Sequence, residues 1–207
     1  MRWIRNILFI LLGIVLLCCE KEPLGQSLTD IDGNTYRTIQ IGTQTWMAEN
    51  LKVTKDKNGN PVISYCYSER DDRCEEFGRL YPWEEAKKSC PEGWRLPTTE
   101  DWQILEIEIG MDMEDAEAFG WRGTDQGIQL KEGGSSGFNA LLAGYKDGIV
   151  LWDGRYFDIG YFGSFWSSSE YDSINAIAYW VYVTSDKIYK KEYDKTSALS
   201  VRCVKEN

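Results

Sequence analysis

The cysteines place the strongest constraint on how this chain of 207 residues folds. Two of the six follow an apolar N-terminal run, and the other four lie in the remainder of the chain: Cys66, Cys74, Cys90 and Cys203. An even number in an exported chain indicates disulfides, and four cysteines allow three pairings. We favour Cys66 with Cys74, which closes a small charged loop, and Cys90 with Cys203, which joins the middle of the chain to its end. The alternative, a metal site of four thiolates, lacks the tight Cys-x-x-Cys spacing of structural zinc.

The N-terminus has the pattern of an export signal. Basic residues precede an apolar run over 7–17, which is shorter than the roughly 20 residues that a permanent transmembrane helix needs. In Leu16-Leu17-Cys18-Cys19 an aliphatic residue stands three places before Cys19 and a small residue directly before it, as in a lipoprotein signal. We therefore expect a signal peptide over 1–18 and lipidation of Cys19. An ordinary secretory signal with incidental cysteines is the alternative.

The organisation that follows is a tether and one domain. Residues 19–27 are the lipidated end and a short polar tether, and residues 28–207 are long enough for a single domain with a sizeable core. A lipid anchor holds such a domain to a membrane while the domain itself stays in water. We expect a protein exported to the cell envelope and anchored there, with the outer membrane as the favoured location.

Charge and composition exclude several functions. Without Arg2 and Arg5 of the signal, 21 Lys and Arg face 33 Asp and Glu, a net charge of −12, so the chain is not expected to bind nucleic acid. It contains no histidine, which excludes Ser-His-Asp and Cys-His catalysis and His-ligated zinc or copper. The run Asp30-x-Asp32-Gly33-Asn34 lacks the glycine and glutamate spacing of a calcium loop, so a turn is favoured there. We expect no enzyme, no cofactor and no metal.

Hydrophobic spacing predicts an α+β domain with two main helices and an antiparallel sheet. The two main helices are expected over 80–90 and from Thr98, where Thr98 and Asp101 form a capping box, to Gly110. Shorter helices are expected over 113–119 and 125–130. Strands are expected over 35–41, 62–67, 138–145, 149–152, 163–169, 178–184, 187–193 and 199–204.

Five ordered blocks of the sequence resemble one known family. The blocks are TDIDGNTYRTIQIGTQTWMAENL, YPWEEAKKSCPEGWRLPTTEDWQIL, GFNALLAGY, FWSSSEYD and ALSVRCV. They are similar to the Fibrobacter succinogenes major paralogous domain of exported lipoproteins from Bacteroidetes and Fibrobacter relatives. The resemblance covers about 28–205 and implies a C-type-lectin-like fold, in which a cysteine after the first helix bridges to one in the last strand, here Cys90 and Cys203.

The same resemblance bears on two sites of related proteins. The block Arg95-Leu96-Pro97-Thr98 also looks like a helix-entry joint of the formylglycine-generating enzyme relatives, whose catalysis uses a late cysteine pair that this chain lacks. It is therefore interpreted as scaffold, with Arg95 paired to a carboxylate. The Glu-Pro-Asn or Gln-Pro-Asp motif of calcium-dependent sugar binding does not occur after Cys90. Calcium-dependent sugar binding of the usual lectin kind is not expected.

A ligand site is predicted in the segment 146–165, which corresponds to the variable binding loops of lectin-like folds. Aromatic residues alternate there with carboxylates and an arginine, a combination that suits a carbohydrate or peptide ligand. The residues predicted to bind are Trp152, Asp153, Arg155 and Tyr156. The alternative is that these aromatic side chains pack within a hairpin and the core.

Three functions remain open from the sequence. The favoured one is a surface lipoprotein domain that binds glycan or protein without catalysis. A structural or assembly component of the envelope is the alternative. An oxidase-like enzyme related to the formylglycine-generating enzymes is disfavoured, because it needs a free thiol among the four cysteines of the domain.

Overall fold

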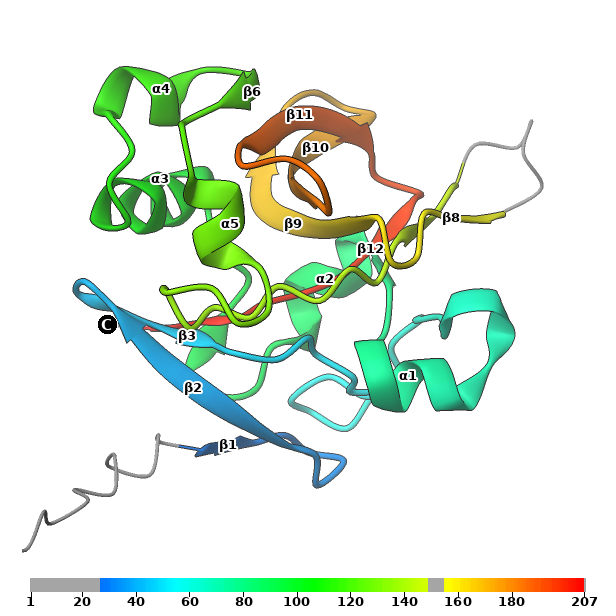
Figure 1. Cartoon of the computed structure of the whole chain (residues 1–207). Helices are drawn as coiled ribbons and strands as arrows, with labels where there is room; N and C mark the ends of the chain where they lie inside the picture. The colour runs from blue at the N-terminus through cyan, green and yellow to red at the C-terminus, as the bar shows by residue number, and fades with distance from the viewer. Residues whose placement is uncertain (1–26, 149–154, 207) are drawn as a thin grey trace, which may run out of the picture.

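The computed structural model describes residues 27–148 and 155–206, and Figure 1 shows their arrangement. The predicted signal, Cys19, the strand expected over 149–152 and the ligand residues Trp152 and Asp153 lie outside the described residues. The strands are β1 (Ser27–Thr29), β2 (Thr35–Ile41), β3 (Gln44–Met47), β4 (Tyr81–Pro82), β5 (Trp94–Arg95), β6 (Gly120–Arg122), β7 (Tyr145–Lys146), β8 (Tyr156–Phe157), β9 (Phe162–Glu170), β10 (Asn175–Tyr182), β11 (Ile188–Asp194), β12 (Ala198–Leu199) and β13 (Val204–Lys205). The helices are α1 (Asp71–Phe77), α2 (Trp83–Ser89), α3 (Thr99–Glu108), α4 (Met113–Glu117) and α5 (Gln126–Leu130).

The strands form three antiparallel sheets, so the predicted α+β class is confirmed. Their orders are β1-β2-β3-β13-β5, β6-β11-β10-β9 and β4-β12-β7-β8. The sheet with β9, β10 and β11 stands at one end of the molecule in Figure 1, with α3, α4 and α5 beside it and the β1-β2 hairpin at the opposite end. The longest helix, α3, has 10 residues, and none in the described part of the chain is long and apolar enough to cross a bilayer.

Two predicted strands are absent from the structure. Residues 62–67 contribute only an isolated bridge from Tyr65 to Leu80, and of residues 138–145 only Tyr145 enters a strand. In the second segment Asn139 has a φ of 52°, which an extended strand does not allow. The carbonyls of Phe138 and Asn139 instead accept hydrogen bonds from the buried Arg202 guanidinium.

Other predicted elements are shorter than expected, and one helix was not predicted. The helix expected over 80–90 begins only at Trp83, because Tyr81 and Pro82 pair with β12. The strand expected over 199–204 is divided between β12 and β13. Helix α1 has a highly charged sequence, and its one buried residue, Cys74, is held by a disulfide rather than by an apolar stripe. Such a helix gives no hydrophobic periodicity that a sequence could reveal.

Aromatic side chains form the core between α3 and the β9-β11 sheet. Trp102 of α3 stacks on Tyr179 of β10 with ring centroids 4.5 Å apart, and Trp46 lies 5.2 Å from Trp102. All three are fully buried. This packing covers one face of the β9-β11 sheet and leaves the opposite face to the rest of the chain.

Candidate functional site

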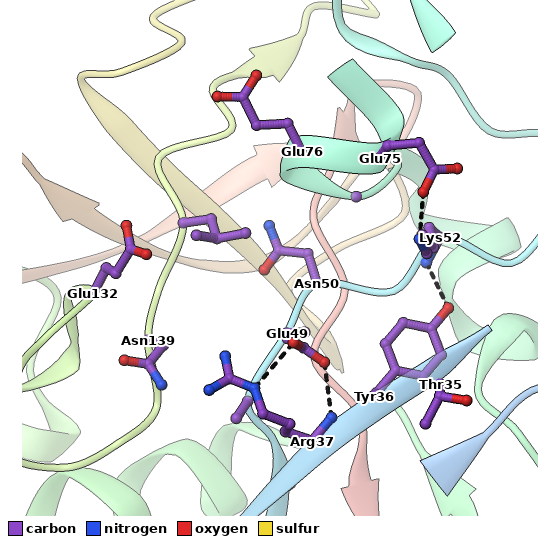
Figure 2. Close-up of a pocket in the computed structure, with 13 residues that line it drawn as sticks. Thr35, Tyr36, Arg37, Glu49, Asn50, Lys52, Glu75, Glu76, Glu132 and Asn139 are labelled. Atoms are coloured by element: carbon purple, nitrogen blue, oxygen red, sulfur yellow. Dashed lines mark hydrogen bonds and ion pairs between the residues drawn. The ribbon is translucent and has the colours of Figure 1, made fainter. Parts of the chain in front are cut away.

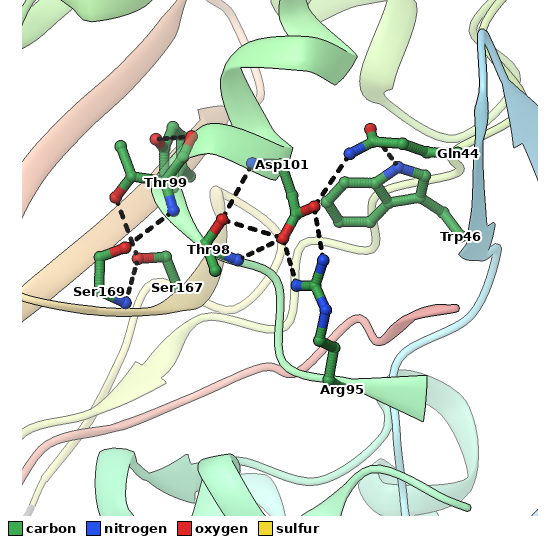
Figure 3. Close-up of polar contacts among 9 residues, drawn as sticks. Gln44, Trp46, Arg95, Thr98, Thr99, Asp101, Ser167 and Ser169 are labelled. Carbon is green, nitrogen blue, oxygen red and sulfur yellow. Dashed lines mark hydrogen bonds and ion pairs between the residues drawn. The ribbon is translucent and has the colours of Figure 1, made fainter. Parts of the chain in front are cut away.

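The Arg-Leu-Pro-Thr block is a joint that starts helix α3 (Figure 3). Thr98 caps the helix: its hydroxyl accepts from the backbone N–H of Asp101, and its own N–H donates to the Asp101 carboxylate over 2.7 Å. The Arg95 guanidinium makes a two-pronged ion pair with the same carboxylate. Burial opposes the ionised form, but the hydrogen bonds from Arg95 and Thr98 lower the pKa of Asp101.

The partners of this joint are all internal. Gln44 donates to Asp101 over 3.1 Å and accepts from the Trp46 indole over 3.1 Å, which ties α3 to strand β3. On the other side the Thr99 N–H donates to the Ser169 hydroxyl at the end of β9. The predicted pairing of Arg95 with a carboxylate is confirmed, and the contacts are those of a scaffold.

Both favoured disulfides are present. Cys66 and Cys74 are joined with their Cα atoms 4.9 Å apart, and Cys90 and Cys203 with theirs 5.9 Å apart. None of these four cysteines is a free thiol. Within the described residues no group of three or more ligating side chains is placed to hold a metal ion.

The two described residues of the predicted ligand site have different environments. Arg155 is exposed, whereas Tyr156 is half-buried and donates its hydroxyl to the Glu69 carboxylate. The Tyr156 ring lies 5.1 Å from that of Tyr67, and the Lys146 ammonium lies 4.3 Å from its centroid. Tyr156 therefore packs the β7-β8 hairpin onto the loop closed by Cys66 and Cys74, as the packing alternative expected for these aromatic residues.

An acidic pocket of about 260 Å³ lies between β2, α1 and the 132–141 segment (Figure 2). Its charges are mostly paired: Glu49 accepts from Arg37 over 3.1 Å, and Lys52 contacts Glu75 over 2.6 Å. Asn50 at its inner wall accepts from the fully buried Arg202. These contacts join β2, α1 and the C-terminal segment. Because most of the charged groups are already paired, few remain in the pocket to bind a ligand.

The surface best suited to a ligand is on the β6-β11-β10-β9 sheet, on the face turned away from α3. Strand register places Trp121 opposite Tyr189, Tyr189 opposite Trp180, and Tyr182 opposite Phe162, all on one side of the sheet. We call this surface the open aromatic face. It comprises Trp121, Phe162, Trp180, Tyr182, Tyr189, Lys191 and Tyr193.

The rings of the open aromatic face touch one another across the strands. Phe162 stacks on Tyr182 with centroids 4.5 Å apart, and Trp121 lies 4.9 Å from Tyr189 and 6.5 Å from Tyr182. Trp121 is 46% exposed at the edge strand, while Phe162, Tyr182 and Tyr189 are half-buried. Trp180 lies deeper, 5.2 Å from Phe162. Trp121, Phe162, Tyr182 and Tyr189 thus form a continuous surface that reaches solvent, while Trp180 is buried and lies 5.1 Å from the ring of Tyr145 in β7.

A lysine completes this face. The Lys191 ammonium lies 4.2 Å from the Trp180 ring centroid and 4.3 Å from that of Tyr193. Desolvation by the surrounding rings lowers the pKa of Lys191. Rings and an ammonium in this arrangement can stack a flat or ring-shaped ligand and hold an oxygen-rich group beside it.

The sequence contained a signal for this face that was not used. Residues 178, 180 and 182 and residues 189, 191 and 193 alternate with period two, so that Trp180 and Tyr182 share a side, as do Tyr189, Lys191 and Tyr193. Phe162 falls within the segment 146–165, where the sequence predicts a ligand site. The register between three strands was needed to bring these residues onto one surface.

Comparisons with known proteins identify a family for this fold and this set of residues. The model of the Fibrobacter succinogenes major domain matches residues 39–205. Comparisons with curated proteins and with solved structures found no match. The matched range includes the helix-entry joint, both disulfides and every strand of the open aromatic face, and the chain belongs to the Fibrobacter succinogenes major domain family.

Proposed function

We propose that this protein is a lipid-anchored component of the cell envelope whose domain binds glycan on the open aromatic face without catalysing a reaction. The N-terminal pattern supports export, with Cys19 as the anchor and the outer membrane as the expected location. The α+β architecture and the Cys90–Cys203 bridge are compatible with the C-type-lectin-like fold that the resemblance implies. The binding surface differs from the one predicted from the sequence.

The observation that carries this proposal is the exposure of contiguous rings on one sheet face. Soluble domains bury most of their large aromatic side chains, so a set of touching rings that stays open to solvent needs an explanation. Trp121, Tyr182 and Tyr189 supply flat apolar faces together with polar tips. Such rings give contact area at little loss of conformational entropy.

Glycan suits this surface better than an extended apolar partner does. Sugar rings present C–H groups on their faces and hydroxyls at their edges, which match aromatic faces bordered by tyrosine hydroxyls and an ammonium. The rings occupy only a few strands, with the exposed Tyr161 next to them in the chain. A protein interface of standard size would need about 800 Å² on each partner.

Glycan binding is tested by screening the purified full chain, with its disulfides intact, against an array of bacterial and plant oligosaccharides. The affinity for each positive glycan is then measured by calorimetry for Trp121→Ala and Tyr182→Ala. We expect each variant to weaken binding at least about tenfold, as for a central interface residue. Turnover is followed by mass spectrometry of the bound oligosaccharide, which we expect to stay intact.

Tyr171→Ala is the matched control. Tyr171 is also an exposed aromatic residue, at 55%, but its ring contact is with Phe119 outside the open aromatic face. We expect its affinity to equal that of the unmodified chain. A loss of affinity equal to that of Trp121→Ala, or saturable binding of a protein fragment but of no glycan, would contradict the proposal.

A further inference from the structure

We propose that the groove between α3 and α4 binds a basic amphipathic helix of a partner protein. This interaction goes beyond glycan binding and does not depend on it, because the groove shares no lining residue with the open aromatic face. Two features carry the inference: the apolar side chains that line the groove, and the uncompensated negative charge around it.

The groove lies where α3 and α4 pack against each other, and it is lined by exposed apolar side chains (Figure 1). Ile104 and Ile107 of α3 are 41% and 38% exposed, and Met113 of α4 is 67% exposed. Exposed apolar side chains that gather in one groove indicate an interaction site, whereas single ones are common on any surface. The volume of about 150 Å³ is below the roughly 300 Å³ of a small-molecule pocket, so it suits one or two inserted side chains.

The two helices carry negative charge that no basic residue of their own balances. Residues 96–121 contain eight Asp and Glu but no Lys or Arg. Two of these carboxylates, those of Glu100 and Glu117, line the groove itself. The exposed carboxylates of α3, α4 and their link form no ion pair in the described chain: Glu100, Glu108, Asp112, Glu114, Asp115 and Glu117.

The cations behind the two helices are already occupied. Lys190 is 3% exposed and donates to the backbone carbonyl of Glu117 over 3.1 Å. Arg122 is 2% exposed and pairs with the buried Glu106. Helices α1 and α2, by contrast, each contain an ion pair between residues three positions apart. The acidic surface of α3 and α4 is therefore left for a positive charge from outside the domain.

An occupant of this groove must supply aliphatic side chains and positive charge together. An amphipathic helix with Lys or Arg beside an apolar stripe does so, and such helices enter grooves with side chains at i, i+3 and i+4. With 10 residues, α3 is about 15 Å long, which is enough to contact about three turns of a partner helix.

Other occupants fit the groove less well. A second copy of this chain would bring the same carboxylates to the interface, and a surface of anionic lipid would also be repelled. The groove lies at the end of the molecule opposite the β1-β2 hairpin, where the described chain begins (Figure 1). A domain anchored through the preceding residues would thus present the groove away from its membrane.

The experiment uses three synthetic peptides of about 15 residues that share one leucine stripe at helical spacing. Their polar positions are filled with lysine, glutamine or glutamate, and binding of each labelled peptide to the purified full chain is measured by fluorescence anisotropy. In about 50 mM salt we expect the lysine peptide to bind at least about tenfold more tightly than the glutamine peptide, and the glutamate peptide not to bind. The difference should shrink in about 200 mM salt, because salt screens exposed charges.

Two apolar variants place the binding in the groove. Ile104→Ala and Met113→Ala should each weaken binding of the lysine peptide at least about fivefold, as for residues that an interface buries. Ile63→Ala is the matched control, because Ile63 is 58% exposed but lies outside the groove. It should leave the affinity unchanged.

A charge variant tests the acidic surround against the acidity of the whole chain. Glu100→Gln combined with Glu117→Gln should weaken binding of the lysine peptide and reduce its preference over the glutamine peptide. Glu132→Gln combined with Glu206→Gln changes the net charge by the same amount at exposed carboxylates elsewhere, and it should leave both values nearly unchanged.

Four results would overturn the proposal. The first is equal affinity of the lysine and glutamine peptides, and the second is an equal loss in the groove variants and their controls. The third is dimerisation of the chain that Met113→Ala abolishes, which would assign the groove to a second copy. The fourth is retention of the chain on vesicles of anionic lipid that the same variant abolishes, which would assign the groove to a membrane.

Discussion

The two faces of the β6-β11-β10-β9 sheet consist of the same strands but differ in the segments that pack on them. The covered face carries Tyr179, Arg122 and Lys190, and α3 buries it with Trp102 and Glu106. On the open aromatic face, Trp180 packs in a core cluster with Trp83 of α2 and contacts Tyr145 of β7, and only the part with Trp121, Tyr182 and Tyr189 reaches solvent. Charged groups occur on both sides, so polarity does not distinguish the faces.

The difference lies in what each charged group contacts. On the covered face Glu106 is fully buried and accepts from Arg122, and Lys190 reaches a backbone carbonyl. On the open face Lys191 contacts only rings within the described chain. On the covered face Arg122 and Lys190 each reach one acceptor, whereas the Lys191 ammonium on the open face has none among the described residues. The covered face is not fully satisfied, because the Arg122 Nε and Nη1 atoms and the Trp102 indole N–H have no partner there. Under the proposed function, the covered face serves stability and the exposed part of the open aromatic face serves binding.

The largest expected effect is a difference in the free energy of unfolding between two tryptophan variants, one on each face. Trp102→Ala should lower the free energy of unfolding by about 3–5 kcal/mol, because it leaves a cavity among fully buried rings. Trp121→Ala on the open face should change it by less than about 1 kcal/mol, since that side chain is 46% exposed. Denaturant titrations of both variants measure the two values. Similar losses would remove the functional distinction between the faces.

The covered face should also make stability depend on pH. Burial raises the pKa of Glu106 to about 7, although Arg122 opposes the shift. A carboxyl with a raised pKa in the folded state favours folding while it is protonated, so its contribution is present below its unfolded pKa near 4.5 and is lost as pH rises to about 7. The loss amounts to about 3 kcal/mol at most.

Glu106→Gln tests this dependence. We expect the free energy of unfolding of the variant to fall less between pH 4.5 and pH 7 than that of the unmodified chain. Glu100→Gln, at an exposed position of the same helix, should retain the slope of the unmodified chain. If the Glu106 variant keeps the full slope, another group is responsible.

A smaller effect is expected where α3 begins. Thr98→Ala removes the helix cap and one hydrogen bond to Asp101, and it should lower the free energy of unfolding by about 1 kcal/mol. Thr184→Ala, at an exposed turn, should have an effect close to zero. Chemical denaturation gives both values, and equal effects would mean that the cap adds nothing to the cover of the sheet.

The smallest expected effect is a difference in the free energy of unfolding between two variants that each remove an indole N–H group. Trp46→Phe breaks the bond to Gln44 and should lower the free energy of unfolding by about 1 kcal/mol. Trp180→Phe loses a similar packing volume but removes a donor that has no partner in the described chain, so it should lower the free energy of unfolding less than Trp46→Phe does. An equal loss in the two variants would show that the Trp180 N–H already has an acceptor, such as a bound water.

Features with a local sequence signal were predictable. Strand β2 followed from the strand-forming residues of Thr35–Ile41 after the turn at 32–34, and the start of α3 followed from the spacing of Thr98 and Asp101. For the disulfides, the positions of the four cysteines and the family resemblance favour the same pairing, and both bridges are present. The residues that determine the strand and the helix start lie only a few positions apart, and four cysteines allow only three pairings.

Features that depend on distant partners were not predictable. The sequence of segment 138–145 predicts a strand, but the carbonyls of Phe138 and Asn139 accept hydrogen bonds from Arg202, about 60 residues away. Lys190 and Lys191 are adjacent and chemically identical, and only the register with β10 and β6 decides which is covered. The open aromatic face depends on the same register, so the sequence placed the candidate site in the neighbouring loop.

The position of β13 has a consequence for when this domain can form during synthesis. Val204 and Lys205 lie between β3 and β5 in the five-stranded sheet, although β3 is made about 160 residues earlier. Until Val204 and Lys205 have been synthesised, that sheet lacks the strand between β3 and β5, and the Arg202 guanidinium and the Cys203 sulfur, which join distant segments, are made only just before them. The five-stranded sheet therefore cannot be completed from the earlier segments alone, and its folding depends on contacts of high sequence separation.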